Sequence, residues 1–445
     1  MIKISHLKLK ILVTLLAFSV TLTAGISYAQ TPVSLKLEAL QNVPPATVIW
    51  QKTYGGSADN RAFYSLPVAD GYLVVGSTGS IVANTTVGWV LRLDSNGNAI
   101  WNKTFLEGSG TEIRYAIDLN DSFLLVGNEF LSTGAVNGYV AKIDSQGNLL
   151  WKIVIGNDEV DKFFSAIATQ DGFVLLGSSS YDANGDSHAT VIKIDLQGNI
   201  LWNKIYGNAT DTVARAGVLA PDGAYAVTGF TDPRGEGNYD FILMKIDSSG
   251  NLIWNKTYGG TGTEEAHSMT KASDGYVIVG DSQSAGTDIH ALVIKVDFTG
   301  NVLWSKTIGG KNADSPAYVT SSSDGGYLVA GFTFSFGAGN RDFWLFKISD
   351  SGQVLWSCTQ GDAGYQEAYS VIETGKNQYV MTGWTDPPGR PDLIGKAQYD
   401  FYIVKIDASQ TNSDISSLQV IISAVIVLVI LLSAFFVVFK FRHRK

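Results

Sequence analysis

The sequence is poor in cysteine and proline, and each shortage narrows the possible folds. Among 445 residues there is one cysteine, Cys358, and there are ten prolines. A single cysteine excludes an internal disulfide and a metal cluster built on several thiolates. So few prolines, with little low-complexity sequence, argue against a disordered chain. A chain of this length can instead be held together by its hydrophobic core.

Basic residues are scarce between the two ends of the chain. Leaving out three lysines before residue 30 and four basic residues after residue 439, 25 basic residues face 41 acidic ones, a net charge of −16. Such a surface repels nucleic acid and anionic lipid. It is compatible with cations, neutral glycans or basic protein patches, and nucleic acid is excluded as a partner.

The first 29 residues have the pattern of a signal peptide. Lys3, Lys8 and Lys10 precede an apolar run from Ile11 to about Thr23, and Ser27-Tyr28-Ala29 follows it. Positive charge, a short apolar stretch and small residues are what signal peptidase requires. An uncleaved anchor is the alternative, although the run is short for spanning a bilayer.

A longer apolar run lies near the other end. Residues 418–439 carry no charge, and Lys440, Arg442, Arg444 and Lys445 follow at once. Twenty-two helical residues at about 1.5 Å each cover roughly 33 Å, enough for a bilayer core. The basic cluster predicts a cytoplasmic tail at residues 440–445, with everything before the helix outside the cell membrane.

Between these ends the sequence repeats itself about every 50 residues. Tryptophan recurs in step with Gly-Tyr-Leu-Val-Val-Gly-like and Val-Ile-Lys-Ile-Asp-like blocks, at Trp50, Trp101, Trp151, Trp202, Trp254, Trp304 and Trp356. This period, with several short strands in each unit, is typical of a β-propeller. We therefore expect an all-β, seven-bladed propeller with one C-terminal transmembrane helix.

The position of the tight turns shows where each blade begins and ends within the repeat. Asp247-Ser248-Ser249-Gly250-Asn251, which recurs in most repeats, predicts a hairpin between the third and fourth strands of one blade. Six blades are then complete, and the seventh has three strands within about 366–407. The leftover strand at 47–54 is predicted to be its fourth strand, which closes the ring and removes an open edge.

These boundaries divide the chain into six parts. We expect a signal peptide at 1–29, an N-terminal lead at 30–46, the propeller at 47–407, a linker at 408–417, a transmembrane helix at 418–439 and a cytoplasmic tail at 440–445.

The stretch from Asp247 to Trp254 resembles the tryptophan-docking motif of PQQ-like (quinoprotein-like) propellers, with one residue fewer between Asp and Gly. The chain also resembles secreted archaeal and bacterial proteins with Trp-Asn-Lys-Thr-Tyr-Gly-Gly repeats. The resemblance implies that the seven tryptophans pack blade on blade. It does not imply dehydrogenase chemistry, because those enzymes have eight blades and commonly a vicinal cysteine pair. We expect no bound cofactor.

Acidic residues about ten positions after each tryptophan are the main candidates for a ligand site. They are Glu112, Asp161, Asp211, Glu264, Asp314 and Glu367. Carboxylates at the mouth of a central channel can bind a cation or a polar ligand. Alternatively, each caps backbone N–H groups or pairs with a neighbouring blade, and their periodic recurrence favours this second interpretation.

Other features are weaker candidates. Basic residues on the third strands, Arg92 and Lys142, Lys193, Lys245, Lys295, Lys347 and Lys405, are interpreted as inter-blade ion pairs or as extended stems. Residues 182–186 match a Ca²⁺ loop only superficially. Aromatic residues near the loop-rich face suit sugar stacking or core packing. Glycosylation sequons stand at Asn84, Asn102, Asn120, Asn208 and Asn255.

The leading functional prediction is a membrane-anchored, extracytoplasmic surface module. It would bind a glycan or a surface protein, or act in adhesion or scaffolding, through loops on one face. The lack of a catalytic motif argues against an enzyme, but the sequence does not decide whether the chain has catalytic activity. The alternatives are a carbohydrate-active hydrolase or lyase, with Glu264, Glu265 and Asp400 as candidate acids, and a scaffold for envelope assembly.

Overall fold

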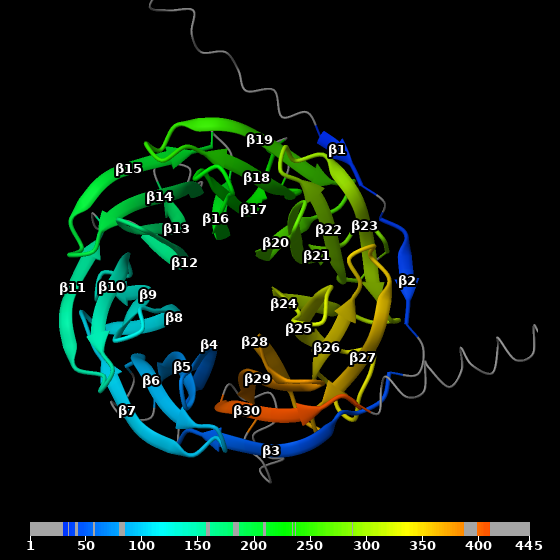
Figure 1. The fold of residues 1–445 in the computed structure, drawn as a ribbon, viewed down its shortest axis with the longest axis horizontal. Coiled ribbons are helices and arrows are strands. Elements are labelled where there is room, and N and C mark those ends of the chain that lie inside the picture. Colours follow the sequence, from blue (N-terminus) through cyan, green and yellow to red (C-terminus); the bar gives the residue numbers. More distant parts are fainter. Residues whose placement is uncertain are drawn as a thin grey trace, which may run out of the picture.

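The computed structural model describes residues 30–33, 35–40, 43–56, 58–79, 85–156, 161–180, 187–207, 211–233, 235, 237–286, 288–386 and 398–409. Within them, seven sheets are arranged in a ring around a common axis, and the four strands of each blade pair antiparallel (Figure 1). The prediction of an all-β, seven-bladed propeller is confirmed. Among the described residues no helix is long and apolar enough to cross a membrane, and the helix expected at 418–439 lies outside them.

Each of the first three blades follows the chain from the axis outward. Blade one contains β4 (Asn60–Val68), β5 (Gly71–Thr78), β6 (Val87–Asp94) and β7 (Ala99–Phe105). Blade two contains β8 (Gly110–Asp118), β9 (Ser122–Phe130), β10 (Val136–Asp144) and β11 (Leu149–Ile155). Blade three contains β12 (Asp161–Thr169), β13 (Gly172–Ser180), β14 (Ser187–Asp195) and β15 (Ile200–Tyr206).

The next three blades repeat this order. Blade four contains β16 (Thr212–Leu219), β17 (Tyr225–Thr231), β18 (Asp240–Ile246) and β19 (Leu252–Gly259). Blade five contains β20 (Glu264–Lys271), β21 (Gly275–Ser282), β22 (His290–Asp297) and β23 (Val302–Gly309). Blade six contains β24 (Asp314–Ser321), β25 (Tyr327–Thr333), β26 (Asp342–Ile348) and β27 (Val354–Gln360).

Blade seven joins the two ends of the propeller. It contains β28 (Gln366–Gly375), β29 (Gln378–Thr385) and β30 (Asp400–Asp407), and its fourth strand is β3 (Thr47–Tyr54) from the start of the chain. β3 pairs antiparallel with β30, from Thr47 opposite Asp407 to Tyr54 opposite Phe401. The predicted closure by the N-terminal strand is therefore confirmed.

The hydrophobic core lies between neighbouring blades. The described residues form seven buried clusters, and each spans one of the seven interfaces. The cluster of Tyr72, Trp89, Val380 and Phe401 joins blade seven to blade one. Second and third strands are buried on both faces, which explains their nearly continuous apolar sequence, because such strands have no solvent side. The ring is thus closed by packing as well as by strand pairing.

Six of the seven tryptophans lie against the hairpin of the next blade; the exception is Trp356, because blade seven has no hairpin between its third and fourth strands. The Trp202 indole N–H donates to the Ser248 carbonyl (3.1 Å), and the Tyr206 hydroxyl donates to the Gly250 carbonyl (2.8 Å). The hairpin glycine has two reasons to be glycine, illustrated by Gly97. Its φ of 76° favours a residue without Cβ, and a Cβ there would come within 2.7 Å of the Trp50 ring.

The N-terminal lead contains two short strands that the sequence analysis did not predict. β1 (Gln30–Pro32) pairs in parallel with β19, and β2 (Leu37–Ala39) pairs in parallel with β23. Further along, Pro45 forms a parallel bridge with Thr359 of β27. The lead therefore runs along the outside of blades four, five and six before β3 enters blade seven (Figure 1).

Candidate binding site at the channel mouth

The two faces of the ring differ in their connections. One face carries the crossovers between blades and the loops between second and third strands, whereas the other carries the turns between first and second and between third and fourth strands. Each innermost strand starts at the first face, because its first residue pairs with the last residue of the second strand, as Glu264 does with Ser282. This arrangement agrees with the loop-rich face expected from the sequence.

Every innermost strand has a β-bulge close to this face. Near this face the register shifts by one residue in β4, β8, β12, β16, β20, β24 and β28, leaving one unpaired residue there in each, and β28 has a second shift at Thr374. A bulge re-aims the side chain of its extra residue and commonly occurs next to functional sites. The seven bulged residues are Phe63, Arg114, Phe164, Arg215, His267, Ala317 and Tyr369.

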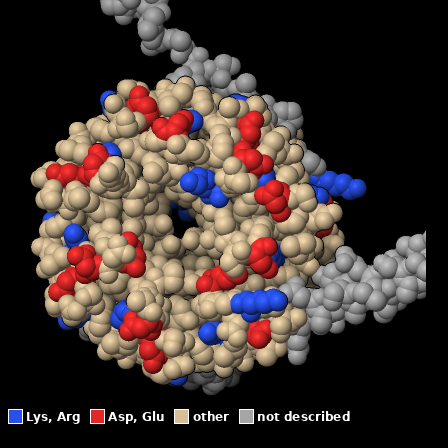
Figure 2. Space-filling view, in the orientation of Figure 1, with Lys and Arg blue, Asp and Glu red and all other residues tan. Residues whose placement is uncertain are grey.

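All seven bulged residues line a single cavity of about 380 Å³. We call this cavity the channel mouth. Besides the bulged residues, its lining includes Tyr64, Tyr115, Asp281, Tyr318 and Phe332. Figure 2 shows Lys and Arg atoms at the edge of the central opening, while acidic atoms are spread over the blades. The cavity lies within the size range of small-molecule sites in proteins.

Two guanidinium groups at the channel mouth are held against aromatic rings. Arg114 lies over the Phe63 ring at 4.3 Å, and Arg215 lies over the Phe164 ring at 4.8 Å. Arg215 is also 5.3 Å from the centre of the Phe230 ring. Stacking fixes the plane of a guanidinium group and leaves its N–H edge available for a planar anion.

The two arginines differ in how fully their charge is paired. Arg114 makes two hydrogen bonds to the Glu112 carboxylate, at 2.7 and 3.1 Å. Arg215 comes no nearer than 4.0 Å to Glu265, and its buried Nε finds no hydrogen-bond partner among the described residues. Burial lowers the pKa of Arg215, and the nearby Glu265 carboxylate opposes that shift. Arg215 therefore has more unused hydrogen-bonding capacity than Arg114.

An acid, an imidazole and a hydroxyl lie beside Arg215. The Ser315 hydroxyl donates to Asp281 (2.6 Å), and His267 Nε2 is 3.7 Å from the same carboxylate. Burial raises the pKa of Asp281, and His267, Ser315 and Arg215 oppose that shift. In this geometry the hydroxyl bonds the carboxylate rather than the imidazole, so the three groups do not form a Ser-His-Asp relay.

Three tyrosines pack together in the lining of the channel mouth. The Tyr64 and Tyr115 ring centres are 4.4 Å apart, those of Tyr64 and Tyr318 are 5.8 Å apart, and the Tyr64 and Tyr318 hydroxyls are separated by 3.4 Å. Burial raises the pKa of all three hydroxyls. They remain neutral at physiological pH and present an uncharged, aromatic surface to a ligand.

The six acids proposed from the sequence do not occupy one register. Asp161, Glu264 and Asp314 lie three positions before the bulged residue of their strand, whereas Glu112 and Glu367 lie two positions before it. Asp211 precedes its strand. The acids lie nine to eleven residues after the preceding tryptophan, so they are not equivalent positions, although the distance from each tryptophan to its bulged residue is constant at thirteen.

Most of these acids are bonded to the backbone or to neighbouring side chains. Glu264 accepts from Gly260 N (2.8 Å) and Ser282 Oγ (2.8 Å), and Asp314 accepts from Gly310 N (2.6 Å). Asp211 accepts from Ser187 N (2.6 Å) and the Tyr239 hydroxyl (3.1 Å). These contacts agree with the backbone-capping alternative. None of the six acids lines the channel mouth.

Glu112, Glu367 and Asp161 have other surroundings. Glu112 also accepts from Asn128 Nδ2 (2.9 Å), and Glu367 pairs with Arg341 and accepts from the Tyr369 hydroxyl (2.7 Å). Asp161 lines a separate small cavity between blades two and three. Two of the acids thus position channel-mouth residues, Arg114 and Tyr369, without lining the cavity.

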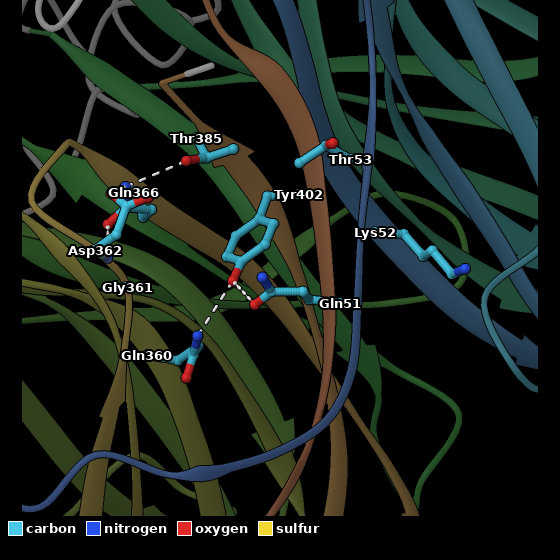
Figure 3. Close-up of a pocket in the computed structure, with 9 residues that line it drawn as sticks. All are labelled: Gln51, Lys52, Thr53, Gln360, Gly361, Asp362, Gln366, Thr385 and Tyr402. Carbon is cyan, nitrogen blue, oxygen red and sulfur yellow. Dashed lines mark hydrogen bonds between the residues drawn. The ribbon is translucent and has the colours of Figure 1, made fainter. Parts of the chain in front are cut away.

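A second cavity lies where the ring closes. About 230 Å³ in volume, it is bounded by blade six and by all four strands of blade seven or their ends (Figure 3). The Tyr402 hydroxyl donates to Gln51 of the closing strand (2.9 Å), and Gln360 donates to that hydroxyl (3.2 Å). Gln366 likewise donates to Asp362 (2.8 Å). The Tyr402 hydroxyl thus links β3 to β30 and to Gln360 of blade six, whereas Gln366 bonds a carboxylate away from β3.

The periodic basic residues form ion pairs mainly within their own blades. Lys193 bonds Asp171 (2.6 Å), and Lys295 bonds Asp274 (2.8 Å), in each case an acid in the turn between the first and second strands. Arg92, Lys245 and Lys347 pair in the same way with Asp70, Asp222 and Asp324. The prediction of an inter-blade pair is confirmed for Lys295, which also reaches Asp350 of blade six (2.7 Å), whereas the pairs of Arg92, Lys193, Lys245 and Lys347 with these turn acids lie within one blade.

The remaining candidates give no further site. Asn102 and Asn120 are exposed and Asn255 is half-buried, while Asn84, Asn208 and residues 182–186 lie outside the described residues. Among the described residues there is no group of three or more His, Cys, Asp or Glu that could hold a metal ion. Cys358 is buried, and burial raises the pKa of its thiol to about 12.

Sequence reasoning missed the bulged residues, yet a signal was present. Phe, Arg, Phe, Arg, His, Ala and Tyr follow one another at this position around an otherwise regular ring. Because the type of side chain at this position changes from one repeat to the next, the position has no structural role common to all blades. Such a break in symmetry marks a binding site better than the recurring acids do.

Comparison with known proteins gives a family but no near relative. The family model PQQ_2, described as outer membrane protein assembly factor BamB, matches residues 86–358. No curated protein matches the chain significantly.

Several solved structures are similar to the chain in fold. A protein of unknown function from Bacteroides caccae has 16% identity over 65% of this chain and 90% of its own, with a TM-score of 0.40. Sqt1 from Chaetomium thermophilum has 12% identity over 83% and 100%, with a TM-score of 0.45. Acylaminoacyl peptidase from Pyrococcus horikoshii has 11% identity over 81% and 54%, with a TM-score of 0.46. None of these likenesses bears on function.

Proposed function

The chain belongs to the PQQ-like propeller family described as outer membrane protein assembly factor BamB, and from this premise we propose that it is a non-enzymatic binding module. Its ligand carries a carboxylate on a ring with an apolar face, as an acidic sugar does. The site is the channel mouth. The observation that carries this proposal is the convergence of all seven bulged residues, two of them arginines stacked on phenylalanine, on one cavity.

The chemistry of the lining supports a carboxylate. The Arg215 guanidinium is oriented by Phe164 and Phe230 and retains a buried N–H without a partner. Pairing with a planar carboxylate would satisfy that donor, since two parallel N–H···O bonds match the geometry of both groups. The aromatic rings of Phe63, Phe164 and Tyr369 would face the ring of the ligand.

Binding is favoured over catalysis by the state of the candidate acids. A glycosidase needs two available carboxyl groups about 5–10 Å apart. Glu264 is fully buried and bonded through both oxygens, and Asp400 belongs to blade seven and bonds Asn60 at 3.2 Å. Glu265 lies beside Arg215 and suits the role of a counter-ion better than that of an acid catalyst.

The proposal includes the membrane topology predicted from the sequence. The uncharged run at 418–439 and the basic residues after it support an anchor with the propeller outside the cytoplasmic membrane. A C-terminal epitope tag should be labelled in cells only after permeabilisation. Labelling of intact cells would contradict this topology.

Calorimetric titration of the full chain in detergent with trigalacturonate tests the ligand. The neutral control is the corresponding galactose trimer, which lacks the carboxylates. We expect saturable binding of the acidic sugar only, weakened at least tenfold by Arg215→Gln. Arg61→Gln is the matched control, because Arg61 stacks on Tyr399 at 4.8 Å but does not line the cavity. Equal binding of both sugars, or no effect of Arg215→Gln, would contradict the proposal.

A second candidate is a scaffold for assembling envelope proteins. The description of the matching family favours it. Cross-linking in membranes should then recover partner proteins through residues of the propeller. Recovery of no partner would count against it without affecting the channel-mouth site.

A further inference from the structure

The N-terminal lead pairs with the outer edges of some blades and leaves those of others uncovered by described residues. The fourth strands of blades four, five and six each receive a parallel segment, at Thr257–Gly259, Thr307–Gly309 and Thr359. All three contacts fall at the same place, starting three residues after the tryptophan of the blade. The lead therefore defines a repeated docking position on the outside of the ring.

Docking of the lead combines main-chain and side-chain contacts. Leu40 N donates to the Gly309 carbonyl (2.9 Å), and Ala46 N donates to the Thr359 carbonyl (2.8 Å). Leu35 packs against the core cluster between blades four and five. Glu38 forms an ion pair with Lys306 of β23. The segment that fits this position is thus extended, aliphatic at intervals and acidic opposite the lysine.

The third residue after the tryptophan differs among the blades. On the covered edges this residue is threonine, and Thr257, Thr307 and Thr359 are 0%, 0% and 2% exposed. It is also threonine on the edges of blades seven and one, which no described residue covers and where Thr53 and Thr104 are exposed. In blades two and three the equivalent residues are Val154 and Ile205, which are 41% and 40% exposed. No described residue pairs with the outer edge of β11 or β15. Two neighbouring edges therefore present β-branched aliphatic side chains to solvent.

Exposed strand edges of this kind readily accept another strand. Lys204 of β15 occupies the position that Lys306 has in β23, two residues after the tryptophan. We propose that β11 and β15 dock an extended segment of a partner protein, which pairs in parallel with them. Aliphatic side chains of that segment would pack against Val154 and Ile205, and an acidic side chain of it would pair with Lys204. The segment would continue the path of the lead, because blade three adjoins blade four, where β1 lies (Figure 1).

A peptide with the sequence of residues 33–40, Val-Ser-Leu-Lys-Leu-Glu-Ala-Leu, is the probe. Its binding to the full chain is measured by fluorescence anisotropy, and its position by hydrogen–deuterium exchange. We expect saturable binding with new protection in β11 and β15. Ile205→Lys and Lys204→Glu should each weaken binding at least tenfold. A peptide with lysine in place of its glutamate should restore binding to the Lys204→Glu variant.

Lys256→Glu is the matched control, because Lys256 has the same place in the motif on an edge that β1 covers. It should leave peptide binding unchanged. The proposal is overturned by an absence of binding, by protection confined to β23, or by failure of the charge-swapped peptide to restore binding. A dimer of the wild type that Ile205→Lys dissociates would assign this edge to a second copy and would also overturn it. None of these results depends on the channel mouth.

Discussion

The tryptophans at equivalent positions of the seven blades are expected to contribute different amounts to the free energy of unfolding. Trp356 is 4% exposed and packs among the buried residues between blades six and seven. Trp202 is only half-buried, and its indole lies against the hairpin of blade four. Burial of an aromatic side chain, rather than its presence in the motif, sets the cost of removing it.

We therefore expect Trp356→Ala to lower the free energy of unfolding by about 3–5 kcal/mol and Trp202→Ala by about 2 kcal/mol. Urea denaturation followed by circular dichroism measures both. Equal unfolding midpoints for wild type and Trp202→Ala would refute its docking role.

A single hairpin aspartate is expected to affect how stable the folded protein is at acidic pH. Burial tends to raise the pKa of Asp297, but hydrogen bonds from Thr299 and Asn301 outweigh it and lower the pKa from 3.8 to about 2. A carboxyl group with a folded pKa below its unfolded value stabilises the protein above the unfolded pKa. That stabilisation is lost as the pH falls through the folded pKa.

Asp297→Ser should consequently destabilise the protein by about 1 kcal/mol at pH 7, after allowing for solvent screening. The difference from wild type should shrink between pH 4 and pH 2, which urea denaturation at each pH will show. Blade six provides the precedent, because Ser349 occupies this place and accepts from Gln353 N at 3.0 Å. A difference that stays constant down to pH 2 would contradict the assignment.

At the scale of elements, the closing strand determines whether the ring is one cooperative unit. β3 is far in sequence from the strand that it pairs with, and Gln51 bonds Tyr402 across the seam. Thr47 and Asp407 are opposite each other at its end. Cysteines at these two positions, with Cys358→Ser, should form a disulfide across the seam.

This disulfide is expected to raise the free energy of unfolding by about 2–4 kcal/mol, since it restricts the unfolded chain over nearly the whole propeller. The reduced form of the same variant is the control. A fully formed disulfide without a higher unfolding midpoint would mean that the seam does not limit stability.

The sequence predicted the strands and their closure but not the elements that build the candidate sites. Alternating and continuous apolar runs, tight Asp-x-x-Gly-Asn turns and the unpaired Thr47–Tyr54 segment were sufficient for the ring. A bulge is a shift between two paired strands, so Arg114 and Arg215 carried no local sign of where they would point. β1 and β2 have three residues each, too few for a recognisable pattern.

At the scale of the whole molecule, the ring separates two surfaces with different chemistry. The channel mouth gathers one bulged residue from every blade, so its composition depends on all seven blades being in place. The outer edge depends instead on single blades and on how far the lead extends around them. A ligand in the channel and a strand on the outside can therefore be bound independently.

The most direct test of this account is hydrogen–deuterium exchange of the full chain with and without trigalacturonate. We predict added protection at the bulged segments of the innermost strands, strongest in β8, β12 and β16, which carry Arg114, Phe164 and Arg215. Protection confined to the outer strands, or none at saturating ligand, would contradict the claim that the seven blades converge on a binding site.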